Sequence, residues 1–255
     1  ITGDSPLLLA QPHGGMQIPE AILARLNPLG RELSDADWHI TRLYADLVDQ
    51  ASQVSMPMHR YVIDANRDPA DVSLYPGQNT TSLCPTTTFD GEEIYLPGQA
   101  PSADEIEERQ QLYHQPYHDA LAEQLQRIHN RHGYAILYDC HSIRSLVPYL
   151  FEGKLPDFNI GSNSGSSCAV EIENAVRLQC ELASTYSTVS NGRFKGGWTT
   201  RHYGRPGQGY HAIQMELAQC NYMDEVAPWH YQPEAARKLR QPLKNILQSL
   251  VDLEL

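Results

Sequence analysis

The chain has 255 residues, of which 41% are hydrophobic, so it is long enough to bury a full core as a single domain over residues 1–255. Its formal net charge of −12, without a stripe of clustered Lys and Arg, argues against a nucleic-acid partner. No run approaches the roughly 18 to 20 apolar residues of a membrane span, and five cysteines without a CxxC pair do not resemble a secreted disulfide framework. We therefore expect a soluble, cytoplasmic protein without a nucleic-acid or membrane partner.

Short apolar runs and helical periodicity divide the chain into alternating strands and helices. Apolar runs bounded by turn residues are typical of buried strands, and apolar residues at helical spacing are typical of the helices that cover them. Two capping boxes, Ser34–Asp37 and Ser102–Glu105, begin two of the helices, and Pro116 should kink the second. In chain order we expect a strand over 6–10, a helix over 34–51, a strand over 59–64, an irregular excursion over 70–101 with a short hairpin near 94–96, a helix over 102–132, a strand over 134–138, a helix over 168–185, a strand over 211–217 and a helix over 233–250.

Strands that alternate with helices imply an α/β fold, with a mixed, mostly parallel central sheet flanked by helices. The ligand crevice of such a sheet lies at the carboxyl ends of its strands. Four groups of polar residues are expected at that edge: His13, Asn66–Arg67, His141 and Glu216. A catalytic zinc needs about three His or carboxylate ligands, an open position for water and a nearby carboxylate to take a proton. The sequence therefore predicts a metal-dependent hydrolase.

Five short motifs lie in a distinctive order over nearly the whole chain. They are Pro12–Gly15, Asp37–His39, Arg60–Pro69, Tyr138–Ser142 and Gly209–Leu217. Together they resemble the N-formylglutamate amidohydrolases, also called N-formylglutamate deformylases. The resemblance implies release of formate from N-formyl-L-glutamate, yielding glutamate in histidine degradation. It also implies a fold related to the zinc carboxypeptidases and aspartoacylases, the phosphorylase/hydrolase-like fold.

The resemblance also implies a metal centre. By matching position, His13 and His141 are ligands of one divalent ion, expected to be zinc, and Glu216 is the general base that activates the attacking water. Zinc carboxypeptidases have a Glu three residues after the first His, but this chain has Met16 there. A carboxylate from elsewhere must replace it, and we expect Asp37. The alternative for Asp37 is to cap the helix predicted over 34–51.

A small anionic substrate is the expected partner. Asn66 and Arg67 match the carboxypeptidase segment that binds the substrate carboxylate, which suits the α-carboxylate of glutamate. The stretch 182–215 has no Asp or Glu, and this charge distribution, rather than the family, favours it as the site for a second, γ-carboxylate, with Arg201 as the best candidate. The cations of this stretch are Arg193, Lys195, Arg201 and Arg205.

Competing interpretations remain open for several residues and for the activity. Arg67 is also placed to pair with Asp64 or Asp68. His114 and His118 lie on one helical face and imitate half of a metalloprotease motif, but the expected Glu is Gln115, which favours a packing or hydrogen-bonding role. The alternative activities are hydrolysis of another N-acyl amino acid and binding of an acidic amino acid without catalysis.

Overall fold

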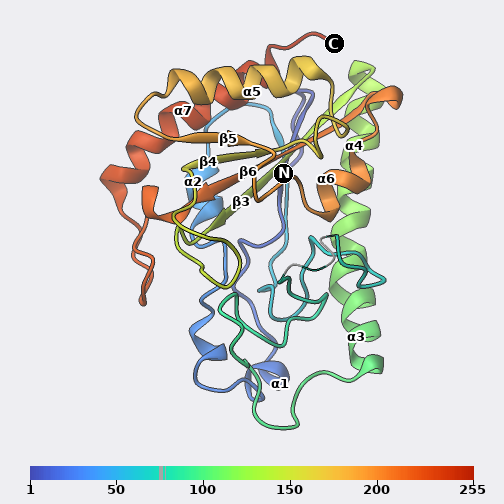
Figure 1. Ribbon diagram of the computed structural model, residues 1–255. Helices are drawn as coiled ribbons and strands as arrows, with labels where there is room; N and C mark the ends of the chain where they lie inside the picture. Colours follow the sequence, from blue (N-terminus) through green and yellow to red (C-terminus); the bar gives the residue numbers. More distant parts are fainter. Residues whose placement is uncertain (75–76, 78) are drawn as a thin grey trace.

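A six-stranded sheet lies at the centre of the computed structural model, which describes residues 1–74, 77 and 79–255 (Figure 1). Its strands are β1 (Leu7–Gln11), β2 (Ser52–Ser55), β3 (Ala135–Ile143), β4 (Phe158–Gly161), β5 (Thr188–Ser190) and β6 (Tyr210–Ala218). They are ordered β2-β1-β3-β6-β4-β5. All neighbouring pairs are parallel except β4 with β6. The sheet is therefore mixed and mostly parallel, as the alternation of strands and helices predicts.

Helices cover both faces of this sheet (Figure 1). The helices are α1 (Glu20–Leu23), α2 (Ile40–Tyr44), α3 (Ala103–Arg109), α4 (Gln115–His132), α5 (Val170–Leu182), α6 (Trp198–Tyr203) and α7 (Pro233–Val251), with 3-10 turns at 30–32, 206–208 and 219–221. Successive residues of a strand point to opposite faces. Leu7 and Leu9 accordingly pack in the core with α5 and α7, whereas Leu8 and Ala10 pack in the core with α4. Burial on both faces explains why β1 and β3 are apolar or fully buried throughout.

The strands and helices that position the functional edge are those with the clearest sequence signal. β1, β3, β6, α5 and α7 confirm the elements predicted at those places. β3 is longer than predicted, because it pairs with β6 as far as Ile143 with Ala218. Asp139 and His141 consequently lie inside the carboxyl-terminal part of a strand rather than after it. The sequence did not predict β2, β4, β5, α1 or α6.

The long helix predicted over 102–132 is present but interrupted. Ser102 caps α3, its Oγ accepting a hydrogen bond from the Glu105 backbone N at 3.3 Å, as the capping box predicts. A π turn at Gln110–His114 separates α3 from α4. Pro116, which lacks the backbone N–H of a helical hydrogen bond, follows in the first turn of α4. The expected distortion of the helix thus lies just ahead of this proline.

The helix predicted over 34–51 is wrong, since only α2 forms there. His39, Asp46 and Gln50 have φ values of 60°, 55° and 64°, which a right-handed helix excludes. The backbone of Ser34–Asp37 forms a turn instead of a capping box, and α2 has no side-chain cap. The carboxylate of Asp37 is therefore not used at a helix terminus.

The strand predicted over 59–64 is also wrong. The Val62 backbone N donates to the His59 carbonyl at 2.8 Å, so the chain turns, although the whole segment is buried. Its carbonyls find side-chain partners instead of a neighbouring strand: Nη1 of Arg109 in α3 donates to the Val62 carbonyl at 2.9 Å. Buried backbone groups need such partners wherever a sheet does not supply them.

The irregular excursion predicted over 70–101 contains no helix or strand among its described residues; residues 75, 76 and 78 lie outside the description. Thr87 and Glu93 form an antiparallel bridge, so a small hairpin lies just ahead of the position predicted for it. In the part of the chain that is described, no helix is both long and apolar enough to cross a membrane.

Candidate metal centre and active site

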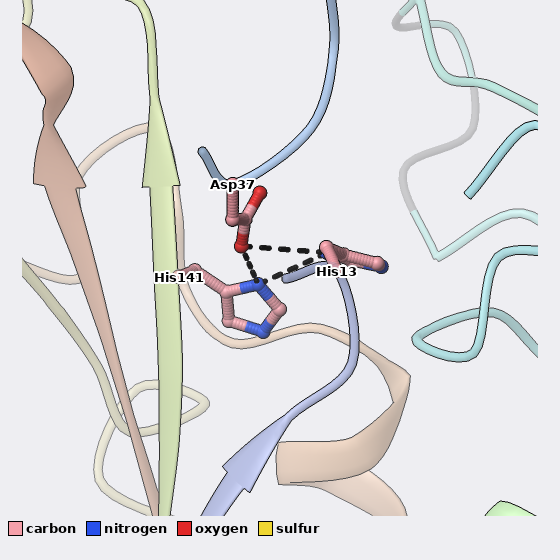
Figure 2. A group of neighbouring side chains, drawn as sticks. All are labelled: His13, Asp37 and His141. Carbon is pink, nitrogen blue, oxygen red and sulfur yellow. Dashed lines mark hydrogen bonds and ion pairs between the residues drawn. The ribbon is translucent and has the colours of Figure 1, made fainter. Parts of the chain in front are cut away.

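Two histidines and one aspartate converge in a buried group (Figure 2). The Nδ1 atom of His13 lies 3.2 Å from Nδ1 of His141. Oδ2 of Asp37 lies 3.2 Å from Nδ1 of His141 and 3.7 Å from Nδ1 of His13. None of the three residues is more than 3% exposed. The structure thus brings together the three residues that the sequence predicts as metal ligands.

Each member of the group comes from a different piece of backbone (Figure 2). His13 follows β1, and His141 lies near the end of β3, which pairs in parallel with β1 as far as Ala10 with Asp139. Asp37 belongs to the turn before α2, and its backbone N donates to the His13 carbonyl at 3.1 Å. Parallel strands end at the same edge of a sheet, so two strands and one tethered turn are enough to assemble the group.

The donor set fits a divalent cation. In a tetrahedral zinc centre with metal–nitrogen distances of about 2.0–2.1 Å, neighbouring ligand atoms lie about 3.3 Å apart. The three separations found here, 3.2, 3.2 and 3.7 Å, are close to that value. Three protein ligands would leave one position open for water or substrate, which is the arrangement of catalytic rather than structural zinc sites.

Behind each imidazole lies a buried carboxylate. Nε2 of His13 donates to Oδ1 of Asp64 at 2.7 Å, and Nε2 of His141 lies 3.1 Å from Oδ1 of Asp139. Asp64 favours protonation of Nε2 on His13, whereas Nε2 of His141 also lies 3.0 Å from the donor Nδ2 of Asn66. Nδ1 of both rings faces Asp37. Burial opposes a charge on His141, but Asp139 and Asp37 outweigh it and raise the pKa of His141 well above its usual value. The site therefore attracts positive charge.

Arg60 balances the buried acids. Its Nη2 donates to Oδ2 of Asp64 at 2.8 Å, its Nη1 lies 4.0 Å from Oδ1 of Asp37, and its guanidinium carbon lies 4.7 Å from the centre of the Phe89 ring. Burial favours the neutral acid, but Arg60 and His13 hold the pKa of Asp64 well below its usual range. The two imidazoles likewise lower the pKa of Asp37 against the effect of burial. Both carboxylates stay ionised.

Glu216 lies beside the metal group on β6, directly paired with His141 in the sheet register. Gln214 donates from Nε2 to Oε2 of Glu216 at 3.1 Å, which confirms the prediction that both share one strand face. Burial raises the pKa of Glu216 to about 8, with Asp37 acting in the same direction and His141 against it. A carboxyl group that titrates near neutral pH is suited to proton transfer.

A pocket of about 670 Å³, part of it open solvent, lies between the group of His13, Asp37 and His141 and the loops outside the sheet. Its other wall carries apolar side chains from three loops, among them Phe89, Leu150 and Phe194. An apolar wall with a few convergent polar groups is typical of small-molecule sites. The site residues predicted from the sequence that line this pocket are His13, Asp37, Asn66, Arg67, His141 and Glu216.

Asn66 and Arg67 are held at the pocket by loops and by α6. Oδ1 of Asn66 accepts a hydrogen bond from the Thr199 backbone N at 2.8 Å. Arg67 donates from Nε to the Thr81 carbonyl and from Nη2 to the Thr81 Oγ1, each at 3.0 Å. Its Nη2 lies 3.9 Å from Oδ2 of Asp64, and a quarter of its side chain is exposed. The pairing with Asp64 is therefore long, and the guanidinium remains accessible from the pocket.

His114 and His118 have hydrogen-bonding roles. Nε2 of His114 donates to the Arg67 carbonyl at 3.1 Å, and Nε2 of His118 donates to the Ala65 carbonyl at 2.8 Å. Burial lowers the pKa of both, that of His118 to about 3, so both rings are neutral donors. The two histidines thus hold the backbone on either side of Asn66.

Arg201, in α6, is not among the described residues that line the pocket; its Nε donates at 3.0 Å to the carbonyl of Gly196, which precedes that helix. Arg193, from the same basic stretch, does line it. The sequence assigned no role to Asp139 and Gln214, although each lies two residues before a predicted site residue in a strand and hence on the same face. Arg60 carried no comparable signal.

Comparison with known proteins identifies an α/β enzyme of the amidohydrolase type. The N-formylglutamate amidohydrolase family model matches residues 5–223. Two relatives named N-formylglutamate deformylase, from Pseudomonas aeruginosa and Pseudomonas putida, are 47% and 44% identical to this chain, covering 98% of it and 94% and 93% of their own lengths. The chain belongs to the N-formylglutamate amidohydrolase family, which confirms the resemblance.

Solved structures confirm the fold. The crystal structure of N-formylglutamate amidohydrolase from Ralstonia eutropha JMP134 matches with a TM-score of 0.80 at 22% identity, covering 97% of this chain and 94% of that one. A gene product of Agrobacterium tumefaciens matches with a TM-score of 0.70 at 19% identity, covering 97% and 90%. The predicted mixed, mostly parallel α/β architecture is therefore shared with both.

Proposed function

We propose that this chain hydrolyses N-formyl-L-glutamate to formate and L-glutamate. The observation that carries the proposal is the meeting in one pocket of three ligand groups, the Glu216 carboxylate and the Arg67 guanidinium. The reaction needs an activated water beside a formyl carbon and a cation for the amino-acid carboxylate, and the pocket offers a group for each task. The names of the two Pseudomonas relatives support the same substrate.

The metal would be held by His13, Asp37 and His141. Imidazole nitrogens with one carboxylate suit zinc among the common divalent ions, so zinc is the metal we expect. When bound, it lowers the pKa of water from about 15.7 toward about 7 and polarises the formyl carbonyl group. Asp64 would orient the His13 ring through its Nε2 atom, and Asn66 and Asp139 lie beside Nε2 of His141, so that Nδ1 of both rings points to the same place.

Glu216 would move the proton. Its carboxylate accepts a proton from the attacking water and returns it to the leaving amine nitrogen of glutamate. Gln214 fixes one carboxylate oxygen and so orients the group toward the pocket. A cation of the pocket, together with the metal, would stabilise the carbonyl oxygen as that oxygen becomes negative.

The two carboxylates of the substrate would be bound by arginines. Asn66 and Arg67 take the α-carboxylate, since a guanidinium pairs with a carboxylate through two parallel hydrogen bonds. The basic stretch 182–215 supplies a cation for the γ-carboxylate, for which the sequence favours Arg201 and the pocket lining favours Arg193.

The proposal includes a cellular setting. As the resemblance implies, the reaction would belong to histidine degradation. It would take place in the cytoplasm, a compartment that suits the five free cysteines. The partner would be a small anion, with no nucleic acid or membrane involved.

Purified protein tests the proposal directly. Formate release would be measured with N-formyl-L-glutamate and N-formyl-L-aspartate, acetate release with N-acetyl-L-aspartate, and bound metal by elemental analysis. We expect N-formyl-L-glutamate to react fastest, with about one metal ion per chain. Preference for another N-acyl amino acid would reassign the substrate. Glutamate binding without any hydrolysis would instead indicate a non-catalytic binding protein.

The general base is tested by Glu216→Gln. This change keeps the shape of the side chain but removes its ability to accept a proton, so kcat should fall by about 10²- to 10⁴-fold while the metal content stays the same. Glu234→Gln, which alters an exposed glutamate at the start of α7, is the matched control. A parental rate for Glu216→Gln would show that another group takes the proton.

A further inference from the structure

Arg193 reaches the pocket from the loop between β5 and α6 and ties two other loops to it. Its Nε donates to the Leu150 carbonyl at 2.9 Å, and its Nη2 donates to the Asn79 carbonyl at 3.4 Å. Asn79 in turn donates from Nδ2 to the Tyr149 carbonyl at 2.8 Å. The Arg193 side chain is therefore positioned by the wall of the pocket before any ligand arrives.

The three arginines that line the described pocket differ in what surrounds them. Arg60 is buried against Asp64 and lies close to Asp37, so its charge is largely balanced within the protein. Arg67 stands next to Asn66, on the side of the predicted α-carboxylate site. Arg193 is held at the pocket wall by its bonds to the Leu150 and Asn79 carbonyl oxygens.

Apolar side chains lie beside Arg193 in the pocket. Its guanidinium carbon is 5.4 Å from the centre of the Phe194 ring, and both Phe194 and Leu150 line the same wall. Such a wall suits the methylene groups of a side chain that ends in a charge. An apolar wall lowers the local dielectric constant, which strengthens the attraction between a guanidinium and a carboxylate.

We infer that Arg193 binds the side-chain carboxylate of the substrate and thereby selects dicarboxylic N-formyl amino acids. This assignment rests on the proposed function, in which the formyl group lies at the metal group and the α-carboxylate at Arg67. A substrate held at those two points presents its remaining carboxylate to a third anchor, and Arg193 is the pocket-lining member of the basic stretch.

The experiment compares two substrates that differ only at the group Arg193 would bind. N-formyl-L-glutamine replaces the γ-carboxylate with an amide of the same shape. For Arg193→Met we expect kcat/KM to fall roughly 30-fold or more with N-formyl-L-glutamate, but less than about threefold with N-formyl-L-glutamine. Arg193→Lys should keep part of the preference, because it retains the charge without the planar fork. Arg177→Met, at an exposed site on α5, is the matched control.

Each alternative outcome has a distinct meaning. Equal losses with both substrates would show that Arg193 only braces the loops and would overturn the inference. A preference that collapses in Arg201→Met but persists in Arg193→Met would give the role to Arg201 and overturn it as well. If the parental protein released formate from neither substrate, the proposed function itself would fall, and this inference with it.

Discussion

The two sides of the pocket are built in different ways. The metal side, with His13, Asp37 and His141, is at most 3% exposed and is anchored to β1 and β3 with a buried acid behind each imidazole. The loop side, with Arg67 and Arg193, comes from segments outside the sheet. Chemistry that needs fixed geometry rests on the sheet, whereas recognition of substrate charge lies on loops, where sequence can change without disturbing the core.

The largest effect should come from breaking the metal side alone. Asp37→Asn keeps the shape of the side chain but removes the charge that would attract the cation. We expect the variant to lose bound metal and at least about 10³-fold in activity, measured by elemental analysis and formate release. Asp35→Asn is the control, because Asp35 bonds Tyr61 and the Phe89 backbone rather than the histidines. Parental metal affinity in Asp37→Asn would place the third ligand elsewhere.

Breaking the loop side should leave the metal in place. Arg67→Met removes the guanidinium proposed to hold the α-carboxylate, so KM for N-formyl-L-glutamate should rise by about 10²-fold with kcat changed only a few-fold. Steady-state kinetics and metal analysis on the same preparation would separate the two sides. Loss of metal from this variant would contradict the separation, because Arg67 contacts none of the three ligands.

Asp64 contacts both the metal side and the loop side of the pocket, so changing it tests how far the two sides are independent. It accepts from Nε2 of His13 and from the Asn66 backbone N, and it pairs with Arg60. Asp64→Asn should weaken metal binding by about 10- to 100-fold, as measured by competition with a chelator, because the imidazole loses its orienting acceptor. Asp139→Asn makes the corresponding change behind the other imidazole. Unchanged metal affinity in both variants would show that these acids do not orient the imidazoles for metal binding.

The smallest effect concerns the helix behind the loop side. Burial lowers the pKa of His118 to about 3, from 6.5 in an unfolded chain. As pH falls from about 6.5 toward 3, the unfolded chain binds a proton that the folded chain refuses, so stability falls. His118→Gln lacks this contribution, so between pH 7 and 4 its Tm should fall less than the Tm of the parental protein, with a difference of about 7 °C. Parallel Tm curves would refute the burial effect.

The sequence predicted the site residues that lie on strands, because apolar runs and alternating residues in the sequence identify the strands of a buried sheet. His141 and Glu216 were found in this way. Asp37 was chosen to replace the carboxylate ligand that the resemblance leads one to expect at Met16, and it lies at the site although the helix predicted to contain it does not form. His39 has a positive φ, which a right-handed helix through this position excludes. Hydrophobic periodicity does not indicate the sign of φ, so the sequence could not show this.

The loop-borne residues Asn66 and Arg67 were predicted through the resemblance, but the cation of the stretch 182–215 that lines the pocket could not be, because its place depends on long-range contacts. Arg193 and Arg201 lie in the same acid-free stretch, and only the path of the chain from β5 into α6 decides which of them lines the pocket. The buried segment 59–64 has the composition of a strand, but its carbonyls are bonded by side chains of a distant helix. No local pattern distinguishes these arrangements from their alternatives.

The helical segment 103–132 supplies the hydrogen bonds that a neighbouring strand would otherwise make to the backbone around Asn66 and Arg67, the residues proposed to bind the α-carboxylate. Arg109, His114 and His118, spread over α3, the π turn and α4, bond the carbonyls between residues 62 and 67. The hydrogen bonds between two paired strands can open one at a time. Bonds that all come from one helical segment should instead break together when that segment separates from the rest of the protein. The backbone around Asn66 and Arg67 and the helical segment 103–132 should thus exchange their amide hydrogens as one cooperative unit. The packing of this segment then determines how firmly Asn66 and Arg67 are held.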